Sequence, residues 1–323
     1  MLKQTLETPA SITTDSNSRA IAAIFLGVVF FSIHDNVVRL LGKEFSVMEI
    51  MFFRALFATP VMFVILKLET GSWSPRLKHP WLTTIRGIVG CSCYISFYMS
   101  IASLPLATST TIFFLAPIMV TVISIFVFKE HVGPRRWMAV IVGFMGIVVI
   151  VNPAEGVRDP AVFFALYSAC TYAIVIIITR HVGPSQSAIS LALNSMLIFF
   201  VVSGICGLVF GDGSLSFSDN PSLQFLLREW IVPSYGDLLL LLACSALASF
   251  GFYGLIQAYR HAEASFVAPF EYVTMPLAVL WGYLFWNEIP PLTTYLGILL
   301  IIGSGVYVLH REALVKRQAL AQS

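Results

Sequence analysis

Long apolar stretches separated by short polar breaks run along nearly the whole chain. A helix needs roughly 20 apolar residues to cross a bilayer, and most of these stretches approach or exceed that length. The breaks hold Pro, Gly and charged residues, as turns and loops do. The pattern therefore predicts an all-α polytopic membrane protein with ten transmembrane helices, at approximately 20–41, 47–67, 80–103, 107–128, 134–151, 160–180, 188–210, 236–258, 264–286 and 293–310.

Three segments lie outside the predicted helices. Residues 1–19 are polar and lack the apolar core of a signal peptide, so we expect a disordered cytoplasmic tail there and a second tail at 311–323. The longest break, 211–235, is expected to be an extracytoplasmic loop. Within it, Leu223–Trp230 fits either a short amphipathic helix at the membrane surface or a plain loop.

Lysine and arginine are distributed unequally between the two sets of breaks. With the N-terminus placed in the cytoplasm, the outer loops hold only Lys43, Arg158 and Arg228. Cytoplasmic loops of membrane proteins are enriched in Lys and Arg, so this distribution predicts that both termini are cytoplasmic. The inner segments hold Lys3, Arg19, Lys67, Arg76, Lys78, Lys129, Arg135, Arg136, Arg180, Arg260, Arg311, Lys316 and Arg317.

Composition supports a membrane protein and argues against several other classes. Hydrophobic residues make up 58% of the chain and charged residues 11%, whereas soluble domains average about 25% charged residues. The net charge of +2 and the lack of a basic cluster with interleaved aromatic residues argue against nucleic acid as a partner. The cysteines form no CxxC pair, and no zinc, nucleotide-binding or hydrolase motif occurs. We therefore expect no soluble-enzyme chemistry, cofactor or metal.

The chain repeats its own pattern at an offset of about 159 residues. A proline, a break containing Glu and a glycine-bearing helix follow one another in residues 98–153 and again in residues 257–310. The two copies fall in halves of five predicted helices each, 20–151 and 160–310. Since five is odd, the second half would enter the membrane from the opposite side. Inverted repeats are typical of secondary transporters, although a duplication retained only for packing would give the same pattern.

Three segments carry a resemblance to a known family. KEHVGPRRWMAVIVGFMGIVVIVNP, NEIPPLTTYLGILLIIGSGVYVLHRE and RLLGKEFSVMEIMFFRALFATP are similar to the ten-helix EamA-type branch of the drug/metabolite transporter (DMT) superfamily. The stretches IRGIVG and APFEYVTMPLAV resemble most the bacterial members that take up S-adenosylmethionine or riboflavin. The resemblance extends over residues 20–310 and implies transport of a small metabolite. Members of the superfamily also export amino acids and other metabolites, so the direction of transport stays open.

The predicted helices contain ionisable residues, among them Asp35, Arg39, Arg54, Arg86 and Glu271, and a charge inside the membrane costs about 2.5–3.5 kcal/mol or more. By their distance from the helix starts, Asp35 and Arg54 lie near the outer side, and Arg86 and Glu271 near the inner side. We therefore predict that Asp35 pairs with Arg54 or Arg39, and that Arg86 pairs with Glu271. These groups would line or gate a central cavity. The alternative is a set of static salt bridges, which we favour for Arg39.

Aromatic and polar side chains recur at equivalent positions of the two repeats. Tyr94 and Tyr98, four residues apart on one helical face, correspond to Tyr253 and Gln257. Aromatic rings with a polar edge can stack on a flat or cationic ligand, so we assign these four residues to the substrate site, with packing as the alternative. His34 is assigned to the gating or ion-pair group, because intramembrane histidines usually face the protein interior. The substrate site is completed by Asp35, Arg54 and Glu271, and the gating or ion-pair group by Arg39 and Arg86.

Two prolines lie inside predicted helices. Pro117 and Pro276 cannot donate a backbone N–H, and each loosens the helix around it. We predict that both helices flex at these prolines during transport. The fifth and tenth predicted helices carry glycines that suit close helix packing, namely Gly143, Gly146, Gly297 and Gly303.

These observations predict a secondary active transporter of a small organic metabolite that is amino-acid-like, nucleoside-like or heteroaromatic. Its two inverted halves would alternate access across a bacterial inner membrane. No ATP-binding motif occurs, so a gradient or exchange would drive transport, and proton coupling through Asp35 or Glu271 stays open. The alternatives are an amino-acid or drug efflux pump of the same family and an intramembrane lipid-modifying enzyme. The expected partners are the substrate and the lipid bilayer, and the oligomeric state is not predicted.

Overall fold

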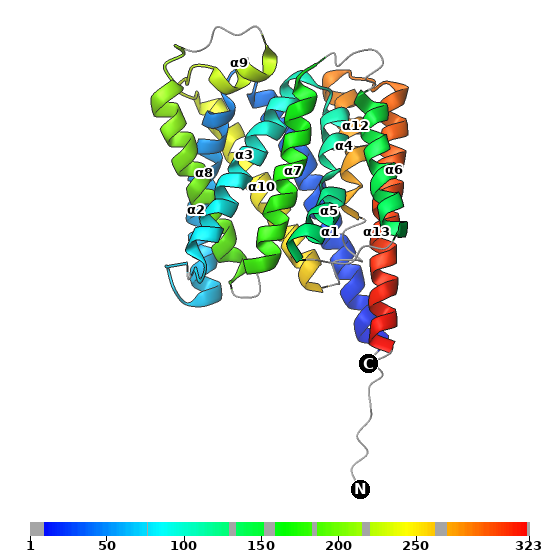
Figure 1. Ribbon diagram of the computed structural model, residues 1–323. Helices are drawn as coiled ribbons and strands as arrows, with labels where there is room; N and C mark the ends of the chain where they lie inside the picture. Colours follow the sequence, from blue (N-terminus) through cyan, green and yellow to red (C-terminus); the bar gives the residue numbers. More distant parts are fainter. Residues whose placement is uncertain are drawn as a thin grey trace.

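The chain is helical throughout the part that the computed structural model describes, residues 10–75, 77–128, 134–151, 159–182, 186–214, 220–261 and 270–321. No strand occurs in these ranges. The helices, labelled as in Figure 1, are α1 (Ala10–Leu41), α2 (Val47–Thr70), α3 (Pro80–Ser103), α4 (Leu106–Phe113), α5 (Ala116–Phe128), α6 (Pro134–Val151), α7 (Ala161–Val182), α8 (Ala188–Phe210), α9 (Pro221–Leu227), α10 (Tyr235–His261), α12 (Thr274–Trp286) and α13 (Leu292–Ala321).

Capping residues and prolines mark the helix ends. Ser46 caps α2, and its Oγ accepts a hydrogen bond from the Glu49 N–H at 3.2 Å. Gly71 ends α2 with a φ of 71°, in the left-handed region that glycine adopts without strain. Pro80 and Pro221 occupy the first turns of α3 and α9. A backbone N–H at this position has no acceptor within the helix, so proline, which lacks one, costs no hydrogen bond there.

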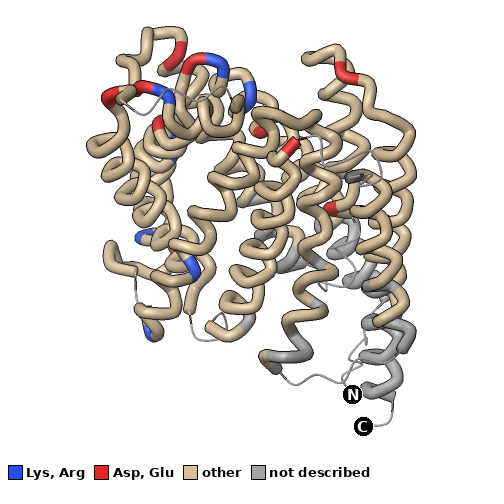
Figure 2. The backbone as a smooth tube through the Cα atoms, turned by 45° about the horizontal axis from the view of Figure 1, so that its top comes forward, with Lys and Arg blue, Asp and Glu red and all other residues tan. Residues whose placement is uncertain are grey.

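Within the described residues, six helical segments are long and apolar enough to cross a membrane, which confirms the prediction of an all-α membrane protein. They are Ile21–Leu41, Val47–Thr70, Pro80–Ser103, Ala161–Thr179, Ala188–Phe210 and Tyr235–Phe252. Shorter apolar helical stretches cover Leu106–Val120, Ile141–Ile150, Thr274–Trp286 and Leu292–Tyr307. The charged residues of the described chain gather mainly near the two ends of the bundle and leave its middle largely uncharged (Figure 2). The count of ten spans stays a prediction.

The helices extend further into the predicted tails and loop than the hydrophobic pattern indicated. α1 begins at Ala10, inside the segment expected to be disordered, and α13 continues to Ala321. Residues 10–20 and 306–321 contain no Pro or Gly that would stop a helix, and the second range is rich in strong helix formers. Within the predicted loop 211–235, α9 confirms the helical alternative, although it begins before Leu223 and ends before Trp230.

The fourth and ninth predicted helices are each interrupted in the middle. A turn at residues 114–115 separates α4 from α5, and Pro117 is the second residue of α5. A turn at residues 272–273 precedes α12, and Pro276 is the third residue of that helix. Proline is tolerated in the first turn of a helix and not in its interior, so each proline begins a new helical segment. Flexing at these breaks stays a prediction.

The helices of the two halves pack in a pattern that is unchanged when the halves are exchanged. α1 packs against α10 and α3 against α7, while α2 packs against α8 and α6 against α13. In the sequence repeat, α3 corresponds to α10 and α6 to α13. Each half therefore contributes the same kind of surface to the contact between them.

Glycines permit the closest helix approaches, as predicted for three of the four positions named above. A Cβ on Gly297 would lie 3.0 Å from the Gly146 carbonyl oxygen, and one on Gly143 would clash with Ile118. Gly303 does not serve close packing, because a Cβ there would have no heavy atom within 4 Å. The hydrophobic pattern did not single out Gly254 of α10, whose Cβ would lie 2.7 Å from the Ala23 carbonyl oxygen of α1.

The first helices of the two halves run in opposite directions. The end of α1 and the end of α3 lie together, since Arg39 and Ile101 line one cavity. At the other end, Thr83 near the start of α3 exchanges hydrogen bonds with Gln186, which follows α7, at 3.2 and 3.3 Å. α7 is therefore antiparallel to both α1 and α3. The start of α1 and the end of α13 lie at one end of the bundle, and α9 lies at the other (Figure 1).

Candidate functional site

Arg54, on α2, lies within a buried cluster of polar and aromatic side chains. Only 4% of its surface is exposed. Its Nη1 donates a hydrogen bond to the Tyr98 hydroxyl at 3.1 Å and lies 3.5 Å from Nε2 of His34. Its Nε has no hydrogen-bond partner, and no carboxylate of the described residues is within ion-pair distance. A buried guanidinium with unused donors is suited to receive an anionic or carbonyl group of a ligand.

His34 connects Arg54 to Asp35. Its Nδ1 lies 3.1 Å from Oδ1 of Asp35, and its other ring nitrogen faces the guanidinium of Arg54. A guanidinium can only donate, so Nε2 acts as the acceptor and Nδ1 carries the proton that is donated to Asp35. The imidazole thus links a buried cation to a carboxylate that is 19% exposed.

Aromatic rings enclose the guanidinium of Arg54. Its Cζ lies 5.0 Å from the ring centroid of Tyr94 on α3 and 5.6 Å from that of Phe199 on α8. The Tyr94 and Phe199 rings meet edge to face, with centroids 5.5 Å apart. These distances are within the range of cation–π attraction, which partly offsets the burial of the charge. The cluster joins α1, α2 and α3 of the first half to α8 of the second.

The structure corrects the predicted ion pair of Asp35. Neither Arg54 nor Arg39 is paired with Asp35, because His34 lies between Asp35 and Arg54, and Arg39 extends to Glu288. The Arg39 guanidinium binds both carboxylate oxygens of Glu288, at 2.5 and 2.9 Å. Arg39 therefore forms an ion pair, in line with the expectation favoured for this residue, but its partner belongs to the turn after α12.

The predicted pair of Arg86 and Glu271 is also corrected. Arg86 donates to Thr179 at 2.6 Å, to Ser195 at 2.9 Å and to the carbonyl oxygen of Leu191 at 3.3 Å. Its described partners are thus neutral oxygens of α7 and α8, which satisfy the guanidinium without a carboxylate. Glu271 is half-buried just before the turn that precedes α12.

Three predicted residues have side chains outside the described part of the chain. The backbones of Tyr253 and Gln257 belong to α10, and that of Pro117 to α5. Of the other predicted substrate residues, the structure brings Asp35, Arg54, Tyr94 and Tyr98 together around His34. Their role in binding stays a prediction.

Several residues of this region were missed in the sequence. Phe199 and Trp281 lie in apolar runs, where the sequence does not distinguish a ring that lines a cavity from one that faces lipid. In the structure, Phe199 lies against the Arg54 guanidinium, and Trp281 donates its indole N–H to the Ser32 hydroxyl. The Trp286 indole donates to Asn36 at 3.1 Å. Glu288 occupies a break between predicted helices, and its place in the repeated motif was the one signal that could have drawn attention to it. No group of three or more His, Cys, Asp or Glu residues in the described chain could hold a metal ion.

Comparison with known proteins gives a family match over nearly the whole chain. The sequence model of the EamA-like transporter family matches residues 18–152 and 159–309. A protein of known crystal structure has the same fold, with a TM-score of 0.59 at 15% identity over 94% of this chain and 99% of that one.

Three curated bacterial relatives are similar over most of their length. The S-adenosylmethionine uptake transporter of Rickettsia prowazekii is 25% identical over 289 residues, which cover 89% of this chain and 91% of that protein. The riboflavin transporter of Rhizobium johnstonii is 24% identical over 75% of this chain and 74% of its own. The pseudopaline exporter of Pseudomonas aeruginosa is 26% identical over 84% and 89%, respectively.

Proposed function

This chain belongs to the EamA-like transporter family, and we propose that it is a secondary transporter that carries a small organic metabolite across a bacterial inner membrane. The family and the relatives are transporters and not enzymes, and the relatives are named for metabolites that they take up or export. The lipid-modifying enzyme considered above is therefore set aside. The substrate is a molecule with an anionic or carbonyl group and a flat ring, or an amino-acid-like molecule.

The observation that carries this proposal is the buried guanidinium of Arg54. A buried charge without a counter-charge is costly, so a chain that retains one there is expected to use it. In the described chain, the partners of Arg54 are a hydroxyl, an imidazole and two rings. We assign Arg54 to the recognition of an anionic or carbonyl group. Tyr94, Tyr98 and Phe199 provide the rings against which a planar or cationic part of the substrate packs.

We further propose that the substrate is released by alternating access between two inverted halves of five spans each, with both termini cytoplasmic. The opposite directions of α1 and α7 support this proposal, as does the packing pattern that is unchanged on exchange of the halves. The two stretches matched by the family model, 18–152 and 159–309, coincide with the proposed halves. Sites between such halves are exposed to one side of the membrane at a time.

Reconstitution tests the proposal. The purified chain is inserted into liposomes, and uptake of radiolabelled S-adenosylmethionine, riboflavin and amino acids is measured with and without a pH gradient. We expect saturable accumulation of at least one compound, and a dependence on the pH gradient if protons are the coupling ion. The Arg54→Gln variant at equal inserted amount serves as the paired control. Equal rates in liposomes with wild type, with Arg54→Gln and without protein would refute the proposal.

The direction of transport is tested in the same system. An uptake transporter and an exporter differ in which face of the protein must meet the substrate first and in the sign of the coupling. Liposomes loaded with the active compound, with the gradient imposed in either direction, therefore show whether flux follows the inward or the outward gradient. The uptake and export functions of the relatives support neither direction over the other.

A further inference from the structure

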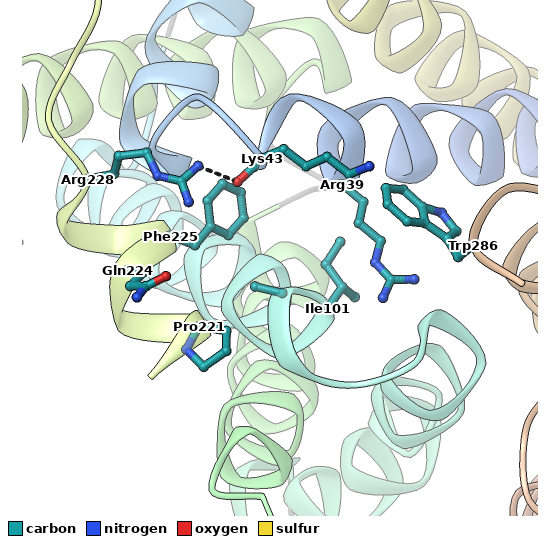
Figure 3. A pocket seen from close by; sticks show the side chains of 10 residues that line it. Arg39, Lys43, Ile101, Pro221, Gln224, Phe225, Arg228 and Trp286 are labelled. Atoms are coloured by element: carbon teal, nitrogen blue, oxygen red, sulfur yellow. Dashed lines mark hydrogen bonds between the residues drawn. The ribbon is translucent and has the colours of Figure 1, made fainter. Parts of the chain in front are cut away.

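A cavity of about 220 Å³ lies at the α9 end of the molecule, opposite the start of α1 and the end of α13 (Figure 1). It begins about one helical turn beyond Asp35 and Tyr98 of the Arg54 cluster, because Arg39 and Ile101 line it. The ends of α1, α3 and α12 form its walls together with α9. Phe225 and Trp286 supply aromatic surface, as Figure 3 shows. The lining residues include Arg39, Gly42, Lys43, Phe225, Arg228 and Trp286.

The charges on the cavity wall are all positive. Arg39, Lys43 and Arg228 contribute cationic groups, and no acidic residue is among the lining residues. Arg228 is fixed by a hydrogen bond from its Nη1 to the Gly42 carbonyl oxygen at 2.7 Å. Burial lowers the pKa of the Arg228 guanidinium and the nearby Glu44 carboxylate raises it, but an arginine stays charged at neutral pH. The Lys43 ammonium lies 4.8 Å from the Trp286 ring centroid and has no carboxylate within ion-pair distance in the ranges described.

Arg39 belongs to this cavity and also to a contact that ties helices together. Its guanidinium lies 4.4 Å from the Trp286 ring centroid and binds the carboxylate of Glu288. The same carboxylate accepts a hydrogen bond from the Leu106 N–H, at the start of α4, at 3.3 Å. Glu288 thus joins the end of α1, the start of α4 and the turn between α12 and α13. We call this contact the Arg39–Glu288 latch.

We propose that the cavity binds the carboxylate of a small organic anion, and that the bound carboxylate competes with Glu288 for Arg39 and so releases the latch. Three cations with aromatic surface suit a carboxylate attached to a small or planar body, since guanidinium groups bind carboxylates in a bidentate manner. The volume is below the roughly 300–1,000 Å³ of drug-sized ligand sites, so the cavity accommodates a small acid or one part of a larger molecule. Carboxylate binding in this cavity does not depend on the proposed transport function. A role of this binding as the first step of transport does depend on that function.

Competition follows from the geometry of Arg39. Its Nη1 and Nη2 both engage Glu288, so a second carboxylate can bind this guanidinium fully only by displacing the first. The ligand gains Lys43 and Arg228 in addition, whereas Glu288 has one described cation. Release of Glu288 removes the described link between α1 and the backbone N–H of α4 at this end of the bundle.

The test uses the full chain in phosphatidylcholine nanodiscs, with succinate as the probe and chloride at equal ionic strength as the reference. The thermal unfolding midpoint is followed against succinate concentration, since a ligand that binds the folded state raises it. We expect a saturable rise with succinate. Lys43→Gln should raise the apparent dissociation constant for succinate at least tenfold. Glu288→Gln should lower it several-fold, because the competing carboxylate is gone.

Lys67→Gln is the matched control, because Lys67 also lies over a tryptophan ring, that of Trp73 at 5.9 Å, but at the other end of the bundle. Equal succinate constants for Lys43→Gln and Lys67→Gln would refute the binding site. An unchanged or higher dissociation constant in Glu288→Gln would refute the competition. If that variant does not fold, Glu288→Asp replaces it; its carboxylate reaches less far, so its dissociation constant should also be lower than that of the wild type.

A further arm uses nanodiscs that contain phosphatidylglycerol. A rise of the midpoint with this lipid but not with succinate would assign the cavity to a lipid headgroup and overturn the proposal. The assay requires no flux, so a chain that binds succinate in the expected variant order but transports none of the compounds tested refutes the proposed function and supports this site.

Discussion

Replacement of Arg54 by methionine should reduce transport at least tenfold without a large loss of stability. Methionine has a similar length and fills the space between Tyr94 and Phe199 with an uncharged side chain. If Arg54 serves the substrate, the folded chain does not depend on its charge. If Arg54 only fixes the packing, its removal should weaken the fold first and transport only as a consequence.

The expected effect on stability follows from the contacts of the guanidinium. The hydrogen bond to Tyr98 at 3.1 Å contributes about 1.5–3 kcal/mol, as bonds to charged groups do. The ring contacts with Tyr94 and Phe199 contribute about 0.5–2 kcal/mol each. Against this stands a desolvation penalty of several kcal/mol for a buried ion, whose Nε is also unpartnered. These contributions largely cancel, so we expect the free energy of unfolding to change by no more than about 1–2 kcal/mol.

The effect on transport is larger. Loss of one charge-assisted bond to the substrate weakens binding by about 1.5–3 kcal/mol, which corresponds to about tenfold to a hundredfold in transport efficiency. Initial uptake rates in liposomes, normalised to folded and inserted protein, measure this effect, and chemical unfolding of the purified variant measures stability. Arg54→Lys keeps the charge without the planar fork and should retain part of the activity. A loss of more than about 3 kcal/mol of unfolding free energy, with unchanged flux per folded molecule, would refute a role of Arg54 in binding.

Three further predictions concern the helix contacts and the topology. Arg86→Met should lower the free energy of unfolding by about 1.5–3 kcal/mol, measured in denaturant, because the bonds to α7 and α8 are lost; an unchanged value would show that these bonds contribute nothing. Gly254→Val should destabilise by about 1–3 kcal/mol or more through a clash with the α1 backbone, whereas Gly303→Val, with open space around it, should leave the unfolding midpoint unchanged; equal midpoints would contradict this explanation. An impermeant maleimide should label Ser214→Cys from outside intact cells and Ser74→Cys only after permeabilisation, and the reverse pattern would overturn the proposed orientation.

The helices could be predicted from the sequence because the signals that define them are local. Hydrophobicity over about 20 residues marks a span, and Pro and Gly mark its ends. Most of the observed helices between α1 and α13 therefore begin and end close to the predicted bounds. The sequence predicted helices loosened at Pro117 and Pro276 but not the turn that the structure has before each proline. The early start of α1 was not predicted either, because a polar helix that leaves the apolar region has no signature in hydropathy.

The ion pairs could not be predicted, because depth in the membrane places a charge along a helix but does not determine the rotation of that helix against its neighbours. Asp35 and Arg54 do reach the same level, since both contact His34. Their pairing fails because the imidazole fits between them. Arg39 pairs with Glu288, which is 249 positions away and lies in a break that hydropathy treats as a loop.

The exchange-symmetric packing of the two halves bears on how the chain is assembled during synthesis. α2 and α6 of the first half meet their partners, α8 and α13, in the second half. The first half is therefore inserted into lipid before its partner surfaces are translated, and final docking waits for the last helix. Two separately encoded polypeptides, divided between α6 and α7, should consequently find each other in the bilayer and reconstitute the intact bundle.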